Sequence, residues 1–163
     1  MRRGGTLLVP AALLAGLWLG GTASGRPVGC APGVTQSKGV TARVFCGPAT
    51  ATVNVGGRTV SFRNGSCDRA AQYVSVNIGS VVLGPVRNKP DYFGLNVGRI
   101  FGAAAPAPKD GTYRGGALAL DFGGKGYAVR ADTITVTLAG NRSKGTFKGS
   151  LLLGGSVTGS FAC

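Results

Sequence analysis

The sequence predicts an all-β protein, built either as an antiparallel β-sandwich or as a closed barrel of about nine short strands. From Val40 onward, apolar and polar residues alternate with a period of two, the spacing at which a strand places side chains on one face. Gly, Pro and Asn interrupt these runs at short intervals, as they do at the turns of antiparallel proteins. No window shows the apolar stripe of an amphipathic helix, so strands and turns are the expected elements.

The first expected hairpin covers residues 51–62. Residues 51–55 place valine on one face and threonine and asparagine on the other, and residues 58–62 place Val60 and Phe62 on one face. A two-residue Gly56-Gly57 connection between two alternating runs is a hairpin signal.

The middle of the chain contains two further runs and a second Gly-Gly hairpin. Residues 73–78 and 92–97 each alternate apolar with polar or small side chains, which predicts two half-buried strands. Residues 118–122 lead through Gly123-Gly124 into residues 127–129, which predicts another hairpin.

The last three runs complete the sheet. In residues 133–138 a row of threonines alternates with Ile, Val and Leu, which is typical of the exposed face of an antiparallel strand. Residues 145–153 and 156–163 are joined by Gly154-Gly155, and Cys163 has the parity of the expected core residues of its strand. The irregular stretches 84–90 and 102–111 are expected to be loops, which are places where binding residues are often carried.

The N-terminus predicts export. Met1-Arg2-Arg3 is a positively charged start, Leu7 to Leu19 is an apolar stretch, and Ala23-Ser24-Gly25 offers small residues for cleavage. We therefore expect residues 1–25 to be a cleaved signal peptide and residues 26–163 to be a single domain that is secreted, extracellular or associated with the cell envelope. No later segment approaches the roughly 20 apolar residues of a transmembrane helix, so none is expected after signal removal.

Four cysteines remain after that cleavage: Cys30, Cys46, Cys67 and Cys163. An even number in an exported domain indicates two disulfides, and three connectivities are possible. We favour Cys30 with Cys46 and Cys67 with Cys163, because a bond at Cys163 would tie down a terminal strand. Without histidine or a C-x-x-C pair no metal site is expected. Lipidation at Cys30 is an alternative, but Pro27-Val28-Gly29 matches the usual processing pattern poorly.

The ionisable residues argue against catalysis. Glu and His are absent, so the usual general bases are missing, and no enzyme activity is expected. The five acids lie at least eleven positions apart and mostly near basic residues: Asp68, Asp91, Asp110, Asp121 and Asp132. A hydrolase would need the fold to bring two of them together, and Asp121 is the most interesting because it lies within a strand. No phosphate-binding glycine motif is present, and no cofactor is expected.

The basic residues favour an anionic environment. Lys and Arg number 18 against five acids, and loss of Arg2 and Arg3 with the signal lowers the net charge from +13 to about +11. These residues are scattered with no run of three, so nucleic acid is not the expected partner. A diffuse positive field would attract anionic envelope polymers or lipid surfaces, although a basic surface can also serve solubility alone.

Three function classes remain at this point. The first is a secreted, non-enzymatic β domain that associates with the cell envelope or its anionic polymers and lipids. The second is a carrier of a small apolar ligand inside the barrel or between the sheets. The third is the Asp-dependent hydrolase. The richness in Gly, Ala, Val and Arg indicates a bacterial source.

Four segments, in order, resemble the LpqH-type lipoprotein antigens of mycobacteria: Cys67, residues 73–79, residues 93–98 and residues 157–163. Small secreted actinobacterial β proteins are similar as well. The resemblance covers roughly residues 58–163 and implies an exported, envelope-associated β domain with a Cys67 to Cys163 disulfide and no catalytic residues. The chain departs from that family because it lacks a convincing lipidation cysteine and a long Ser/Thr-rich tether, and because it adds Cys30 and Cys46.

Overall fold

The structure, a computed structural model, describes residues 30–37, 39–99 and 105–163, so the expected signal peptide lies outside the described residues. These residues form twelve strands and one 3₁₀ turn, and every strand pairing is antiparallel. The strands are β1 (Gly33–Ser37), β2 (Val40–Phe45), β3 (Ala49–Val55), β4 (Arg58–Ala70), β5 (Tyr73–Leu83), β6 (Tyr92–Gly98), β7 (Gly111–Arg114), β8 (Ala117–Phe122), β9 (Lys125–Ala128), β10 (Thr135–Ala139), β11 (Lys144–Ser150) and β12 (Ser156–Ala162). The all-β prediction is confirmed, and the expected number of about nine strands is too low.

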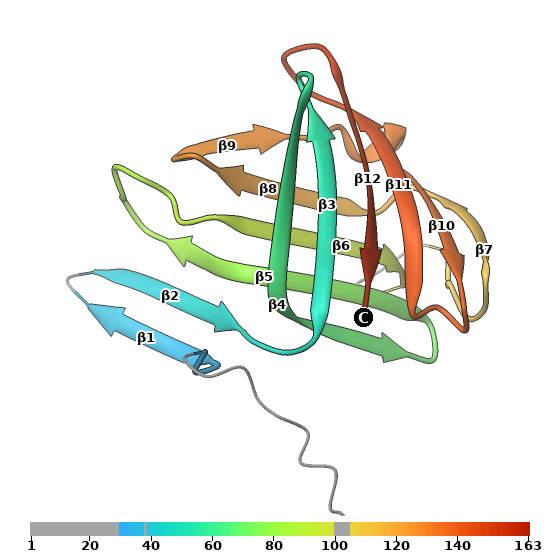
Figure 1. Cartoon of the computed structure of the whole chain (residues 1–163), viewed down its shortest axis with the longest axis horizontal. Coiled ribbons are helices and arrows are strands. Elements are labelled where there is room, and N and C mark those ends of the chain that lie inside the picture. Colours follow the sequence, from blue (N-terminus) through green and yellow to red (C-terminus); the bar gives the residue numbers. More distant parts are fainter. Residues whose placement is uncertain (1–29, 38, 100–104) are drawn as a thin grey trace, which may run out of the picture.

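The strands belong to one continuous sheet that curls into a half-barrel with two layers (Figure 1). Ten strands follow the order β7-β10-β11-β12-β3-β4-β5-β6-β8-β9, and the β1–β2 hairpin joins through β2 to β5. In Figure 1 the strands of the layer from β7 to β3 run across those of the layer formed by β5, β6, β8 and β9. The core lies between these layers.

Strand β4 explains why the sheet is continuous and not a sandwich of two separate sheets. Its first half pairs with β3 and its second half, from Ser66, pairs with β5. Between them Asn64 has a φ of 65° and the register with β3 shifts, so the strand bends into the second layer. Gly65 sits against β5, where a Cβ atom would collide with Ile78 and with the carbonyl of Asn77. The glycine therefore permits the crossing.

The prediction of a closed barrel is also wrong, because in the described part of the chain the end strands β7 and β9 do not pair with each other. Both are only four residues long. Just beyond β9, an isolated bridge joins Val129 to Leu151, and the amide of Arg130 donates to the carbonyl of Ser150 (2.9 Å). The β9 end of the sheet thus meets β11 at one corner.

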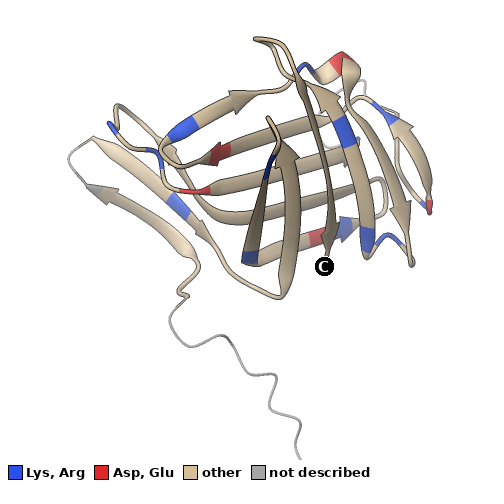
Figure 2. Cartoon of the chain, turned by 45° about the horizontal axis from the view of Figure 1, so that its top comes forward, with Lys and Arg blue, Asp and Glu red and all other residues tan. Residues whose placement is uncertain are grey.

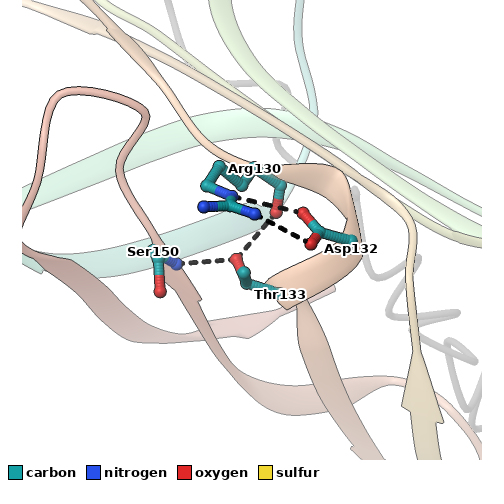
Figure 3. A network of polar contacts seen from close by, with 4 residues as sticks. All are labelled: Arg130, Asp132, Thr133 and Ser150. Atoms are coloured by element: carbon teal, nitrogen blue, oxygen red, sulfur yellow. Dashed lines mark hydrogen bonds and ion pairs between the residues drawn. The ribbon is translucent and has the colours of Figure 1, made fainter.

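A 3₁₀ turn, Ala131–Thr133, builds that corner (Figure 3). The Thr133 hydroxyl donates to the carbonyl of Arg130 (2.7 Å) and accepts from the amide of Ser150 (2.8 Å). The Arg130 guanidinium pairs with Asp132 at 3.2 Å on the exposed side. Residues 133–138 were expected to form one strand, but this turn delays the start of β10 to Thr135.

The core joins the two layers through aromatic contacts. The ring of Phe93 on β6 lies 5.8 Å from that of Phe62 on β4 and 5.5 Å from that of Phe147 on β11. Gly159 on β12 faces the Phe147 ring, and a Cβ atom there would collide with that ring. Burial of each large apolar side chain stabilises the fold by roughly 1.5–3 kcal/mol. The inward positions are those that the period-two pattern predicts.

Two disulfides connect the cysteines as favoured from the sequence: Cys30 with Cys46, and Cys67 with Cys163. The first clips the β1–β2 hairpin, and the second joins β4 to the residue after β12. The sulfur of Cys30 is therefore in a disulfide, whereas lipidation would require it as a thioether. Two disulfides indicate an oxidising compartment. Within the described ranges, no helix is long and apolar enough to cross a membrane.

The expected loops are found where the structure describes them. Residues 84–90 contain no strand, although Lys89 makes one isolated bridge to Gly124. Residues 105–110 are irregular, and Gly111, which was expected in the loop, begins β7.

Candidate functional site

The outer surface of the β7-β10-β11-β12-β3-β4 layer carries a polar array that we call the threonine face. Because the strands are in register, two rows of outward side chains cross all six strands. The first row is Thr112, Thr137, Thr146, Ser160, Thr52 and Ser61. The second row is Arg114, Thr135, Lys148, Thr158, Asn54 and Thr59.

The spacing of the threonine face follows from sheet geometry. Neighbouring strands lie about 4.8 Å apart, and residues two apart on a strand are about 6.8 Å apart. The apolar partners of these residues, such as Val53, Val136 and Phe147, point into the core. The face is therefore a repeating lattice of hydroxyl groups with two cations, and no carboxylate belongs to either row.

A hollow of about 550 Å³ lies on this face over β10, β11 and β12. Its lining includes the Lys148 side chain and four threonines: Thr135, Thr137, Thr146 and Thr158. Thr137 shares a hydroxyl hydrogen bond of 3.0 Å with Thr112. Neither Lys148 nor Arg114 forms an ion pair with a carboxylate of the described residues. The hollow thus offers hydroxyl groups around an uncompensated ammonium.

The opposite layer carries a different cluster on its outer surface, centred on Tyr92. The Tyr92 hydroxyl donates to Asn77 Oδ1 (2.7 Å), and Asn77 Nδ2 donates to the hydroxyl of Ser75 (2.9 Å). The Phe45 ring lies 5.9 Å from the Tyr92 ring, and the Arg43 guanidinium lies 5.0 Å from the centre of the Phe45 ring. Burial raises the pKa of Tyr92, with a further increase from the carboxylate of Asp121 and a decrease from Arg43. These groups satisfy one another and leave little to bind a ligand.

A second hollow, of about 420 Å³, lies near the β8–β9 hairpin. Its lining includes Lys89 and the small residues Ala119, Gly126 and Ala128. The Lys89 ammonium lies 3.5 Å from the carboxylate of Asp121. Because its cation is paired, this hollow is a weaker site for an anion than the one on the threonine face.

All five aspartates have structural partners. Asp68 accepts from the Tyr73 hydroxyl (2.7 Å), which is the main cause that raises the pKa of Tyr73. Asp110 accepts from the backbone amides of Asn141 (3.0 Å) and Arg142 (2.6 Å).

The remaining three aspartates make one contact each to a neighbouring group. Asp91 accepts from the amide of Gly123, Asp121 pairs with Lys89, and Asp132 pairs with Arg130. Asp91 directly precedes β6, and Asp121 lies in β8, where it pairs with Tyr92. Asp91 contacts the β8–β9 turn, Asp121 contacts Lys89 of the 84–90 loop, and Asp132 contacts Arg130 beside the 3₁₀ turn.

The carrier hypothesis concerns the interior of the half-barrel. The side chains of both layers meet there through the rings of Phe62, Phe93 and Phe147, as described above. Two further rings, Phe122 and Tyr127, stack with their centres 4.5 Å apart. Both hollows described above open on outer surfaces.

The threonine face was only partly visible in the sequence. The threonine row of residues 133–138 was expected to be exposed, and Thr135 and Thr137 are on the face. Its continuation over six strands depends on register, which the sequence pattern does not reveal. The signal that could have found it is the Thr-x-Thr or Thr-x-Ser spacing that recurs in β4, β10 and β12.

The basic residues are spread over both layers and the loops, as Figure 2 shows. This scatter agrees with the distribution expected from the sequence. The resemblance to LpqH-type antigens stays a prediction. Comparisons of the chain with protein-family models, with curated proteins and with solved structures find no match.

Proposed function

We propose that this protein is a non-enzymatic β domain that binds anionic, hydroxyl-rich polymers of the cell envelope through its threonine face. The observation that carries the proposal is the hollow in which four threonines lie around Lys148, within two rows that contain no carboxylate. The two disulfides agree with an extracytoplasmic location.

Charge supports an anionic partner. Lys148 and Arg114 belong to the same row and are separated by one strand, so their backbones are about 10 Å apart. A single exposed ion pair contributes little, about 0–1 kcal/mol. A polymer with repeated anionic groups can engage both cations at once, and the second contact then benefits from a high effective concentration.

The hydroxyl groups support a polymer that is itself rich in hydroxyl groups. Threonine and serine hydroxyls both donate and accept hydrogen bonds, as sugar and polyol hydroxyls do. β-branched threonine side chains have restricted rotamers, so less entropy is lost when they order on binding. Neither row of the face contains an aromatic residue, which favours an extended charged chain over a stacked sugar ring.

The test compares binding of the exported protein to a polyuronate, to a polyol phosphate and to a neutral glucan by isothermal titration calorimetry. The variant Lys148→Gln/Arg114→Gln removes both cations from the face. The matched control Lys125→Gln/Arg87→Gln removes the same charge from two residues off the face. We expect the face variant to lose about tenfold in affinity for the polyanions, and the control to stay within about twofold.

A second variant, Thr146→Val/Thr158→Val, keeps shape and charge but removes two hydroxyls from the hollow. It should lower the affinity for the polyanions, and the loss relative to the unchanged protein should be larger at high salt, where the ionic contribution is screened. Equal losses of affinity in the face variant and the control would show that binding depends only on net charge, and this would overturn the proposal. Equal affinity for the neutral glucan would overturn it as well.

A further inference from the structure

The turn between β11 and β12, residues 151–155, exposes two adjacent leucines. The side chains of Leu152 and Leu153 are 65% and 98% exposed. Large apolar side chains that project together into water commonly mark a contact with another apolar phase. Their neighbour Leu151 is partly buried and packs against the core. We call this segment the leucine turn.

The leucine turn is held in place by its backbone. The Leu151 amide donates to the carbonyl of Gly155 (3.0 Å), and the Leu152 amide donates to the carbonyl of Ala128 (2.8 Å). Gly154 and Gly155 have φ values of 95° and 90°, which side chains other than hydrogen disfavour. The turn therefore presents Leu152 and Leu153 on a defined support.

Basic residues surround the leucine turn. The β3–β4 turn, which bears Arg58, lies beside it at the same end of the molecule (Figure 1), and the Arg58 guanidinium lies 5.7 Å from the centre of the Phe122 ring. Arg130 lies on the other side, since its amide bonds to Ser150. The threonine-face row that contains Lys148 and Arg114 is the row nearer to this end. Asp132 lies here as well, and it pairs with Arg130 (Figure 3).

We propose that the leucine turn inserts into the surface of an anionic lipid membrane. Apolar tips flanked by cations bind at the boundary between headgroups and acyl chains, with the cations held by anionic headgroups. A second copy of the chain is a poorer occupant, because stable interfaces bury about 800 Å² per partner and two leucines supply much less. Cations on both copies would also repel.

With the leucine turn in the membrane, the threonine face can also bind its polymer, although neither contact depends on the other. Strand β11 leads into the leucine turn and β12 leads away from it, so the threonine face stands out from the membrane when the leucines are inserted (Figure 1). The face then lies beside polymers next to the membrane. The lipid contact itself rests on the leucines and their flanking cations.

The test measures sedimentation of the exported protein with vesicles of phosphatidylglycerol and phosphatidylcholine, and with vesicles of phosphatidylcholine alone. Leu152→Ser/Leu153→Ser should lower partitioning into the anionic vesicles by about tenfold or more. The control Val34→Ser/Leu83→Ser removes two exposed apolar side chains elsewhere, and it should stay within about twofold. Arg58→Gln should weaken binding to the anionic vesicles only.

A Leu153→Trp variant provides a direct readout of insertion. Its indole fluorescence should shift to shorter wavelength with anionic vesicles, compared with the same variant in buffer. Unchanged partitioning of the leucine-to-serine variant, or an unshifted emission of the Leu153→Trp variant, would overturn the membrane proposal. The leucine-to-serine variant should keep its affinity for the polyanions, so failure of lipid binding and failure of polymer binding are distinguishable.

Discussion

The two ends of the half-barrel are built in different ways. At one end, which we call the tied end, Cys67 is bonded to Cys163, and the amide of Cys163 donates to the carbonyl of Ser143 (2.8 Å). The Arg142 guanidinium donates to the carbonyls of Ala70 (2.6 Å) and Ala107 (3.2 Å). At the opposite end, the leucine turn and the β3–β4 turn project with glycines at their tips.

The tied end contributes to the stability of the fold, whereas the leucine end presents side chains to a partner. The tied end connects β4, β12, the β10–β11 turn and the loop before β7 through one covalent bond and several polar contacts. The leucine end exposes apolar side chains that add nothing to the core. Regions with few buried contacts are the ones that proteins use for binding. We therefore expect substitutions at the tied end to change the free energy of unfolding and substitutions at the leucine end to change binding.

The largest effect should follow from loss of the long disulfide. Cys67→Ala/Cys163→Ala opens a loop with a sequence separation of 96 residues, and we expect a loss of about 2–5 kcal/mol in the free energy of unfolding. Cys30→Ala/Cys46→Ala opens a loop of 16 residues and should cost less, because shorter loops restrict the unfolded chain less. Denaturant unfolding of both variants measures the difference. A larger loss from the short bond would contradict the special role of the tied end.

The next effect should come from Arg142. Its φ of 60° is already strained, so Arg142→Met keeps the backbone strain similar and removes the guanidinium. Hydrogen bonds to charged groups contribute about 1.5–3 kcal/mol each, but the Nε atom of Arg142 is buried without a partner, which offsets part of the gain. We expect a loss of about 2 kcal/mol, measured by denaturant unfolding. Faster hydrogen exchange at the Ala107 amide should accompany it, and a change confined to the leucine end would refute the assignment.

Tyr92 is 8% exposed and packs against Asn77 and Phe45, so it shares no contact with the residues named at either end. Tyr92→Phe removes the hydrogen bond to Asn77 and should cost about 1 kcal/mol, additive with Arg142→Met because the sites share no partner. Burial raises the pKa of folded Tyr92 above the 10.0 of an unperturbed tyrosine, so its stabilising contribution is complete below that pH and is lost as the pH rises through the raised pKa. The free energy of unfolding, measured from about pH 9 upward, should therefore fall less steeply with pH in Tyr92→Phe than in the unchanged protein. An unchanged slope would show that Tyr92 is not the group that titrates.

The sequence pattern predicts some of the contacts at the tied end and not others. Cys163 shares the parity of the core residues of β12, so its inward position follows from local alternation, which agrees with the favoured bond to Cys67. The contacts of Arg142 and Asp110 do not, because they join segments that are distant in the chain.

The same limit applies to the strands. Strand β1 lacks an apolar face, since its residues 33–36 are exposed, and so no period-two signal marks it. The run 58–62 is only the first part of β4, because Gly65 allows the strand to continue into the second layer. The threonine face requires the register of six strands, which long-range pairing determines.

The smallest effect on folding should come from the leucine turn. Leu152 and Leu153 are mostly exposed, so Leu152→Ser/Leu153→Ser should change the free energy of unfolding by less than about 0.5 kcal/mol. The neighbouring Leu151→Ser should cost more, because Leu151 packs against the core. Thermal and denaturant unfolding of the two variants measure this contrast within one turn. Should the exposed pair prove as destabilising as Leu151, those leucines would serve folding, and the separation of a stabilising end from a binding end would not hold.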